Sequence, residues 1–171
     1  LRPAIGNVQL LASPGTLGDH PDLKQLPHQM KRMGFDILAP QDYGGRSMDP
    51  AEALNLVKRH VAALIDAGRA LRNTGCTLWS NCELFNLAPS PDGRSICIPG
   101  PFERIKQQIT MQAPHVEKLL CYQYQGIMNR KTDDVDIGAP GADELYHHYQ
   151  SYRKSFSPEN SLSKQENPMR T

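Results

Sequence analysis

The sequence lacks several features that would define a function class at once. Its 19 basic and 18 acidic residues leave a net charge of +1, so no basic surface for nucleic acid or for an anionic membrane is expected. No apolar run approaches the roughly 18 residues that cross a bilayer, which excludes a transmembrane helix. We therefore expect a globular protein with no nucleic-acid partner and no transmembrane segment.

Motifs that mark cofactor sites are also missing. The four cysteines form no C-x-x-C pair, which leaves a zinc ribbon or a thioredoxin-type redox centre without support. No G-x-G-x-x-G and no G-x-x-x-x-G-K-[ST] sequence follows a predicted strand, so a nucleotide-binding doubly wound fold loses its main support. There is no G-x-S-x-G elbow, and the histidines fall in or beside predicted helices. We expect no cofactor and no metal site, and the cysteines are either buried thiols or disulfide partners.

What the chain does contain is a regular alternation of short strands and helices. The clearest helix begins at Asp49-Pro50, where an N-cap carboxylate, a proline at N1 and Glu52 satisfy the first backbone N–H groups. Its predicted apolar stripe is Leu54, Val57, Val61, Leu64 and Ile65. The predicted strands are residues 4–12, 35–39, 77–85 and 116–124, and the predicted helices begin near residues 23, 50, 101 and 142.

Four units of strand and helix, each of about 35 to 40 residues, predict parallel strands joined by right-handed crossovers. The fold class is therefore α/β, with four consecutive βα units and a parallel sheet over residues 1–155. Residues 156–171 lack apolar spacing and are expected to form a disordered tail. The chain begins with Leu1 rather than methionine, so we expect it to be processed or to be part of a longer protein.

Polar and aromatic side chains gather at the ends of the predicted strands, where parallel βα folds bind their ligands. On the third strand Trp79, Asn81, Glu83 and Phe85 alternate, and they should share one face. Aromatic rings pack on sugar rings, amides and carboxylates bond hydroxyl pairs, and a strand-end glutamate can act at an anomeric carbon. The candidate substrate-binding residues are Gln41, Asp42, Tyr43, Trp79, Asn81, Tyr122 and Tyr124.

A purely structural interpretation of the same residues stays open. Glu83 can be a hydrogen-bonding partner at a strand end, and Trp79 can belong to the core. Asp42 can cap the turn at Gly44, because aspartate favours turns by bonding to nearby backbone N–H groups.

Four short segments carry motifs in a fixed order. Residues 35–44 contain D-I-L-A-x-Q-D, residues 78–85 contain L-W-x-x-x-E-x-F, residues 11–14 end in S-P, and residues 104–108 match R-[IL]-x-x-Q. These segments resemble the domain-of-unknown-function family DUF4434, which is regarded as a glycoside-hydrolase-like (β/α)8 barrel. The similarity covers about residues 3–129.

The resemblance implies that the predicted strands are the last four of a barrel, a fold that usually needs ~250 residues. Glu83 would end the seventh strand, where retaining barrel glycosidases carry the nucleophile. The acid/base would lie at the end of the fourth strand, before Leu1, ~5 to 5.5 Å from the nucleophile. Gln41, Asp42, Trp79, Asn81 and Tyr124 would line the sugar site.

The resemblance also implies partners and a location. The ligand would be a poly- or oligosaccharide, and the partner would be an N-terminal half-barrel or a second copy of the chain. We expect a secreted or periplasmic protein. The alternative to a hydrolase is a non-catalytic carbohydrate-binding or structural half-barrel.

Overall fold

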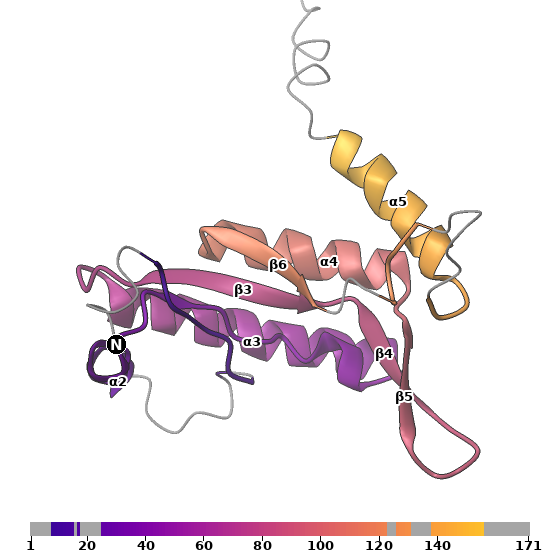
Figure 1. Cartoon of the computed structure of the whole chain (residues 1–171), viewed down its shortest axis with the longest axis horizontal. Helices are drawn as coiled ribbons and strands as arrows, with labels where there is room; N and C mark the ends of the chain where they lie inside the picture. Colours follow the sequence, from indigo (N-terminus) through magenta and orange to yellow (C-terminus); the bar gives the residue numbers. More distant parts are fainter. Residues whose placement is uncertain (1–7, 16, 18–24, 123–125, 131–137, 156–171) are drawn as a thin grey trace, which may run out of the picture.

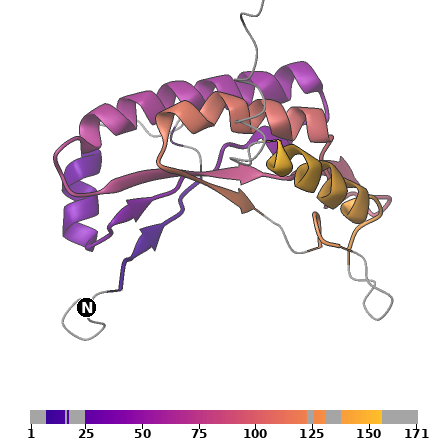
Figure 2. The same ribbon diagram turned by 90° about the horizontal axis from the view of Figure 1, so that it is seen from above.

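The computed structural model describes residues 8–15, 17, 25–122, 126–130 and 138–155. It consists of a parallel four-stranded sheet with helices α3 (Pro50–Leu71) and α4 (Phe102–Gln112) side by side on one face (Figures 1 and 2). In the described part of the chain, no helix combines the length and the apolarity needed to cross a membrane.

The strands follow one another across the sheet in chain order. The order is β1 (Leu11–Ala12), β2 (Ile37–Leu38), β3 (Thr77–Glu83) and β6 (Lys118–Tyr122), and every neighbouring pair is parallel. A helix separates each strand from the next, and α5 (Ala142–Lys154) follows β6. The predicted α/β class with consecutive βα units is confirmed.

Helix α2 (Leu26–Met33) shows how local sequence sets the ends of an element. Pro27 lies in its first turn, where a missing N–H costs nothing. Gly34 ends the helix with φ 73°, a left-handed conformation that glycine adopts without a side-chain clash. The predicted start of this helix at residue 23 lies outside the described residues.

Helix α3 begins as predicted, but its buried face differs from the predicted stripe. The Asp49 carboxylate accepts a hydrogen bond from the Ala51 N–H at 2.9 Å. The buried residues are Ala53, Val57, His60, Ala63, Leu64, Ala67 and Leu71. Small alanines face the sheet and let the helix approach closely, so the larger Leu54, Val61 and Ile65 are left half-buried on its flanks.

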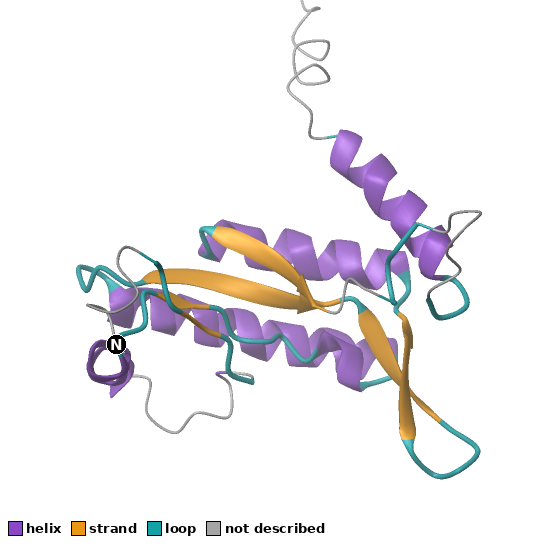
Figure 3. Cartoon of the chain, viewed as in Figure 1, coloured by secondary structure: helices purple, strands orange, loops and turns teal. Residues whose placement is uncertain are grey.

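The predicted strand 77–85 is shorter than expected, because the chain leaves the sheet after Glu83. Strands β4 (Phe85–Pro89) and β5 (Ser95–Pro99) form an antiparallel hairpin that continues from the end of β3 (Figure 3). The turn between them contains Pro91-Asp92-Gly93, and Gly93 has φ 79°. Proline, aspartate and glycine between two apolar runs are typical of a hairpin, so the prediction of one long strand here is wrong.

Two groups of buried apolar side chains hold the helices to the sheet. The first lies under α2 and α3 and the second lies under α4 and α5. The first contains Leu17, Leu26, Met30, Leu38, Ala63, Leu64, Ala67, Leu71 and Leu78, and the second contains Cys82, Leu84, Phe85, Ile105, Ile127, Met128 and Leu145. The four cysteines are all free thiols, so the disulfide alternative is not observed.

Candidate active site

The two faces of β3 have different surroundings. Ser80 points toward the helices, because its hydroxyl bonds to Gln112 of α4 at 2.6 Å. Asn81 points the other way and donates to the Ser13 hydroxyl at 3.2 Å. Since side chains alternate along a strand, Trp79, Asn81 and Glu83 share the face opposite α3 and α4. This shared face agrees with the spacing in the sequence.

Glu83 ends β3 and is only 2% exposed. Its Oε2 atom accepts a hydrogen bond from the Gly45 N–H at 3.0 Å. Burial, and next the negative charge of Asp42, raise the pKa of Glu83 from 4.5 to about 7, although the Gly45 N–H, Arg46 and Arg104 act in the opposite direction. Near neutral pH this carboxyl group therefore exists in both protonation states and can accept or release a proton.

The donor to Glu83 comes from the short 3-10 helix η3 (Gly44–Arg46), which crosses the carboxyl end of the sheet. A Cβ atom on Gly45 would lie 2.2 Å from the carbonyl oxygen of Phe85. Only glycine allows this close approach of two backbone segments. The Gly44-Gly45 pair, too short for a phosphate-binding motif, thus brings a backbone N–H to the candidate carboxylate.

Asp42 has no exposed surface and lies between the sheet and α4. Its Oδ1 accepts from the N–H groups of Gly44 and Glu83 at 3.1 and 3.2 Å. Its Oδ2 accepts from Gln108 and Gln112 at 2.7 and 2.6 Å. Four protein donors occupy the carboxylate, which leaves no free oxygen for a ligand in this structure. The geometry matches the alternative in which Asp42 caps the turn at Gly44.

A buried polar network, which is not among the features predicted from the sequence, extends from Asp42 into the helix layer. Ser80 donates to Gln112, and His60 lies 2.8 Å from the Ser80 hydroxyl. Burial lowers the pKa of His60 from 6.5 to about 4, so the ring is neutral at physiological pH. The sequence does contain a pattern that indicates this network. Gln108 and Gln112 follow the buried Ile105 at helical spacing, which places two polar side chains on the buried face of α4.

The other predicted site residues lie along the same edge of the sheet. Gln41 pairs with Asn81 through a backbone bridge, and Tyr122 is in register with Glu83 and 37% exposed. Tyr43 is half-buried, and the Arg46 guanidinium lies 3.4 Å from its ring centre. Tyr124 lies outside the described residues.

Two further residues lie beside these candidates. The hydroxyl of Ser13 joins the first strand to the third through Asn81. The Lys118 ammonium lies 4.8 Å from the ring centre of Trp79, which is itself half-buried. Lys118 begins β6 directly opposite Trp79, so only the strand register could have revealed this pair.

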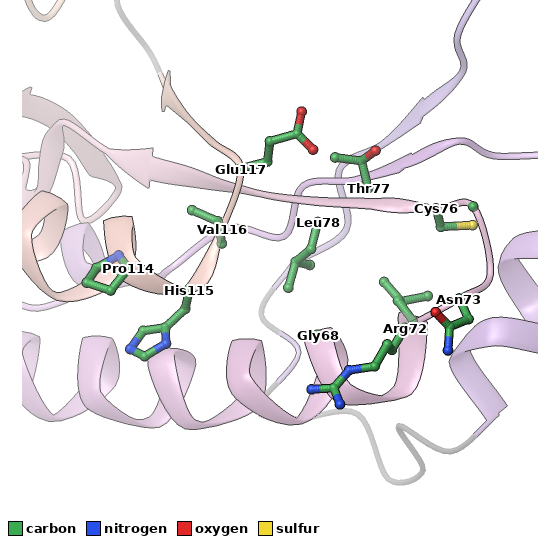
Figure 4. Close-up of a pocket in the computed structure, with 12 residues that line it drawn as sticks. Gly68, Arg72, Asn73, Cys76, Thr77, Leu78, Pro114, His115, Val116 and Glu117 are labelled. Carbon is green, nitrogen blue, oxygen red and sulfur yellow. The ribbon is translucent and has the colours of Figure 1, made fainter.

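Two cavities lie at the opposite, amino-terminal edge of the sheet. One of about 440 Å³ is lined by the end of α3 and the starts of β3 and β6, including Arg72, His115 and Glu117 (Figure 4). A larger one of about 740 Å³ adjoins it at Asn73 and Cys76. Parallel βα folds carry their ligands at the carboxyl ends of the strands, so the edge with Glu83 is the candidate site. In the described part of the chain, no three His, Cys, Asp or Glu side chains could hold a metal ion.

The parallel sheet with its βα crossovers defines an α/β domain, and a buried carboxylate lies at the carboxyl end of β3. Residues 8–134 match the family model of a domain of unknown function (DUF4434), and the chain belongs to this family. The resemblance inferred from the four short segments is confirmed.

A solved structure supports the same fold. It is the crystal structure of a "putative alpha-L-fucosidase" from Bacteroides thetaiotaomicron, with a TM-score of 0.57 and 16% identity. The match covers 87% of this chain and 44% of that protein, so the chain spans less than half of that protein's length. No curated protein matches the sequence.

Proposed function

We propose that the chain forms the carboxyl-terminal half of a carbohydrate-active (β/α)8 barrel and that Glu83 is the nucleophile of a retaining glycoside hydrolase. The observation that carries this proposal is the row Trp79, Asn81 and Glu83 on β3. The row lies on the face opposite α3 and α4 and ends at the carboxyl edge of the sheet. It offers one aromatic surface, one amide and one carboxylate to the same side.

Each member of this row suits a step in breaking a glycosidic bond. Trp79 can pack against a sugar ring, and Asn81 and Gln41 can bond its hydroxyl groups. The Glu83 carboxylate attacks the anomeric carbon while a second carboxyl group protonates the departing oxygen. Water then attacks the glycosyl-enzyme ester as that second group takes back a proton, which releases the sugar and regenerates Glu83.

The second carboxyl group would come from the other half of the barrel. The described sheet has four strands of the eight that close a barrel, with β1 and β6 at its edges. Leu11 and Tyr122 at these edges are 38% and 37% exposed. Unpaired edges and exposed apolar side chains favour pairing with further strands, supplied by an N-terminal half-barrel or by a second copy of the chain.

The test is hydrolysis by a protein in which both halves of the barrel are present. The first substrates to try are α-L-fucosides, because of the fold shared with the Bacteroides protein. Glu83→Gln should lower kcat by about a thousandfold or more while sugar binding persists, because the amide cannot form the ester. The matched control is Glu117→Gln, an exposed glutamate at the amino-terminal edge, which should keep full activity. Unchanged turnover by Glu83→Gln would contradict the proposal.

One observation favours the non-catalytic alternative. Glu83 is 2% exposed and one of its oxygens is bonded to Gly45, as expected for a structural carboxylate. In that case the whole protein would bind glycans through Trp79 without releasing products, and Glu83→Gln would leave binding unchanged.

The pH dependence of hydrolysis should report the ionisation of Glu83. A nucleophile must be ionised, and the pKa of Glu83 is raised to about 7. We expect kcat/KM to rise about tenfold per pH unit below this pKa and to reach a plateau, which ends where the proton-donating second carboxyl group ionises. Initial rates over a range of pH measure this limb. A rate that shows no rise with pH below 7 would contradict an ionised Glu83 as the nucleophile.

A further inference from the structure

We propose that Asp42 is a positioning residue for Glu83, which holds the end of β3 and the η3 turn together so that the Gly45 N–H meets the Glu83 carboxylate. Its catalytic meaning rests on the proposed function, whereas the positioning itself can be tested without any substrate. The sequence predicts that Asp42 contacts sugar or caps a turn, and its complete burial favours a role within the protein.

Three hydrogen bonds form a closed circuit at the carboxyl edge. Asp42 Oδ1 accepts from the backbone N–H of Glu83 and from the N–H of Gly44. Glu83 Oε2 in turn accepts from Gly45, the next residue of the turn. Asp42 thus bonds to both segments that must stay in register, although they are about forty residues apart in the sequence.

The helix layer fixes the other oxygen of Asp42. Gln108 and Gln112 donate their amide N–H groups to Oδ2, and each amide has its orientation set by a donor at its own oxygen. Arg104 donates to the Gln108 oxygen, and Ser80 donates to the Gln112 oxygen. With their oxygens occupied, both amides must turn their NH₂ groups toward Asp42.

His60 completes this orientation. The Ser80 hydroxyl proton is directed to Gln112, so Ser80 can only accept from His60, whose Nε2 must carry the hydrogen. The series of donors that runs from His60 through Ser80 and Gln112 therefore ends at Asp42, which accepts hydrogen bonds at both of its oxygens.

The pKa of Glu83 depends on the charged groups around it, so a titration of Glu83 can test the role of Asp42. Asp42 from the loop after β2 raises the pKa of Glu83, whereas Arg46 from η3 and Arg104 from α4 lower it. Cys97 of β5 also lies close enough for the charge of Glu83 to raise the pKa of its thiol, after burial. Removing the charge of Asp42 should therefore lower the pKa of Glu83.

The test is a pH titration of the Gly45 amide by NMR in this chain. In the wild type its chemical shift should titrate with a midpoint near 7, and Glu83→Gln should abolish that titration. In Asp42→Asn the midpoint should fall, and exchange of the Gly45 amide with solvent should rise about tenfold. The matched control is Asp49→Asn, because asparagine caps a helix nearly as well as aspartate, and it should leave the Gly45 amide unchanged.

Two further variants keep the proposal testable if Asp42→Asn does not fold. Gln108→Met and Gln112→Met each remove one donor to Asp42 and fill a similar volume. Each should speed the exchange of the Gly45 amide, while the Thr77 amide at the start of β3, which donates to the Asp36 carbonyl oxygen, keeps its protection. An unchanged Gly45 amide in all the folded variants would overturn the positioning role. Failure to find hydrolysis would overturn the proposed function alone, because this titration needs no sugar.

Discussion

Replacing Glu83 by glutamine is expected to raise the free energy of unfolding at about pH 8 by about 3 kcal/mol. The pKa of Glu83 is raised from 4.5 to about 7, mainly by burial and then by Asp42. Each pKa unit corresponds to about 1.4 kcal/mol, so ionising Glu83 costs the folded state about 3 kcal/mol more than it costs the unfolded state. Glutamine is neutral and its amide oxygen can still accept from Gly45. A candidate catalytic residue that weakens the fold fits the common trade between stability and activity.

The sign of the pH dependence separates this effect from a general change in packing. Between pH 4.5 and 7 the folded state keeps a proton on Glu83 that the unfolded state has lost, so its contribution is present at low pH and is lost as pH rises through 7. His60 acts oppositely, because its pKa is lowered to about 4 and its contribution is lost as pH falls below 6.5. Stability in Glu83→Gln should therefore rise with pH over this range.

Urea unfolding at about pH 5 and about pH 8 measures both effects, since stability follows from the midpoint and the slope. Glu117→Gln, the exposed control, should match the wild type at both pH values. A Glu83→Gln protein that is equally destabilised at both would show that the carboxylate contributes through its hydrogen bond, and that its charge is not costly.

Replacing Gly45 by alanine is expected to lower the free energy of unfolding by about 3 kcal/mol. The added Cβ would lie 2.2 Å from the Phe85 carbonyl oxygen and 3.1 Å from Glu83 Oε2. Phe85 cannot move away freely, because it is paired with Pro99 in the hairpin and its carbonyl accepts from Arg104. The turn must shift instead, and that shift breaks the bond between Gly45 and Glu83.

Chemical denaturation measures the free energy of unfolding of Gly45→Ala, and a second glycine variant serves as the control. Gly68 lies inside α3, where an added Cβ would meet Leu78 at an ordinary 3.6 Å. Gly68→Ala should keep or raise stability, because alanine favours a helix by about 1 kcal/mol over glycine. Equal stability of the two alanine variants would mean that the turn yields easily and that the Gly45 contact is not tight.

Local rules were sufficient for the elements with strong terminal signals. Asp49 and Pro50 start α3 where predicted, and Gly34 ends α2 where predicted, because capping depends on residues next to each other in the chain. Such rules did not predict which face of α3 is buried. Alanines and the polar His60 face the sheet there, and only the fit between helix and strands selects them over Leu54.

The hairpin after β3 and the role of Asp42 were not predicted from the sequence, for two different reasons. The hairpin was missed although its turn residues are local, since a run of apolar residues through position 85 suggested one long strand. The sequence is compatible with two roles for Asp42, a ligand contact and a turn cap. Its surroundings come from Gln108 and Gln112, far along the chain, so the sequence around Asp42 contains no trace of them.

The sequence by itself determined the class of fold, the family and the row Trp79, Asn81 and Glu83, because alternation, capping and short motifs are encoded among neighbouring residues. Only the tertiary structure decided which side of the sheet the helices cover. It also decided that Asp42 faces the helices and that Gly45 reaches Glu83. Those facts depend on contacts between distant segments, and the free energy of burying and pairing polar groups arises only when the segments meet.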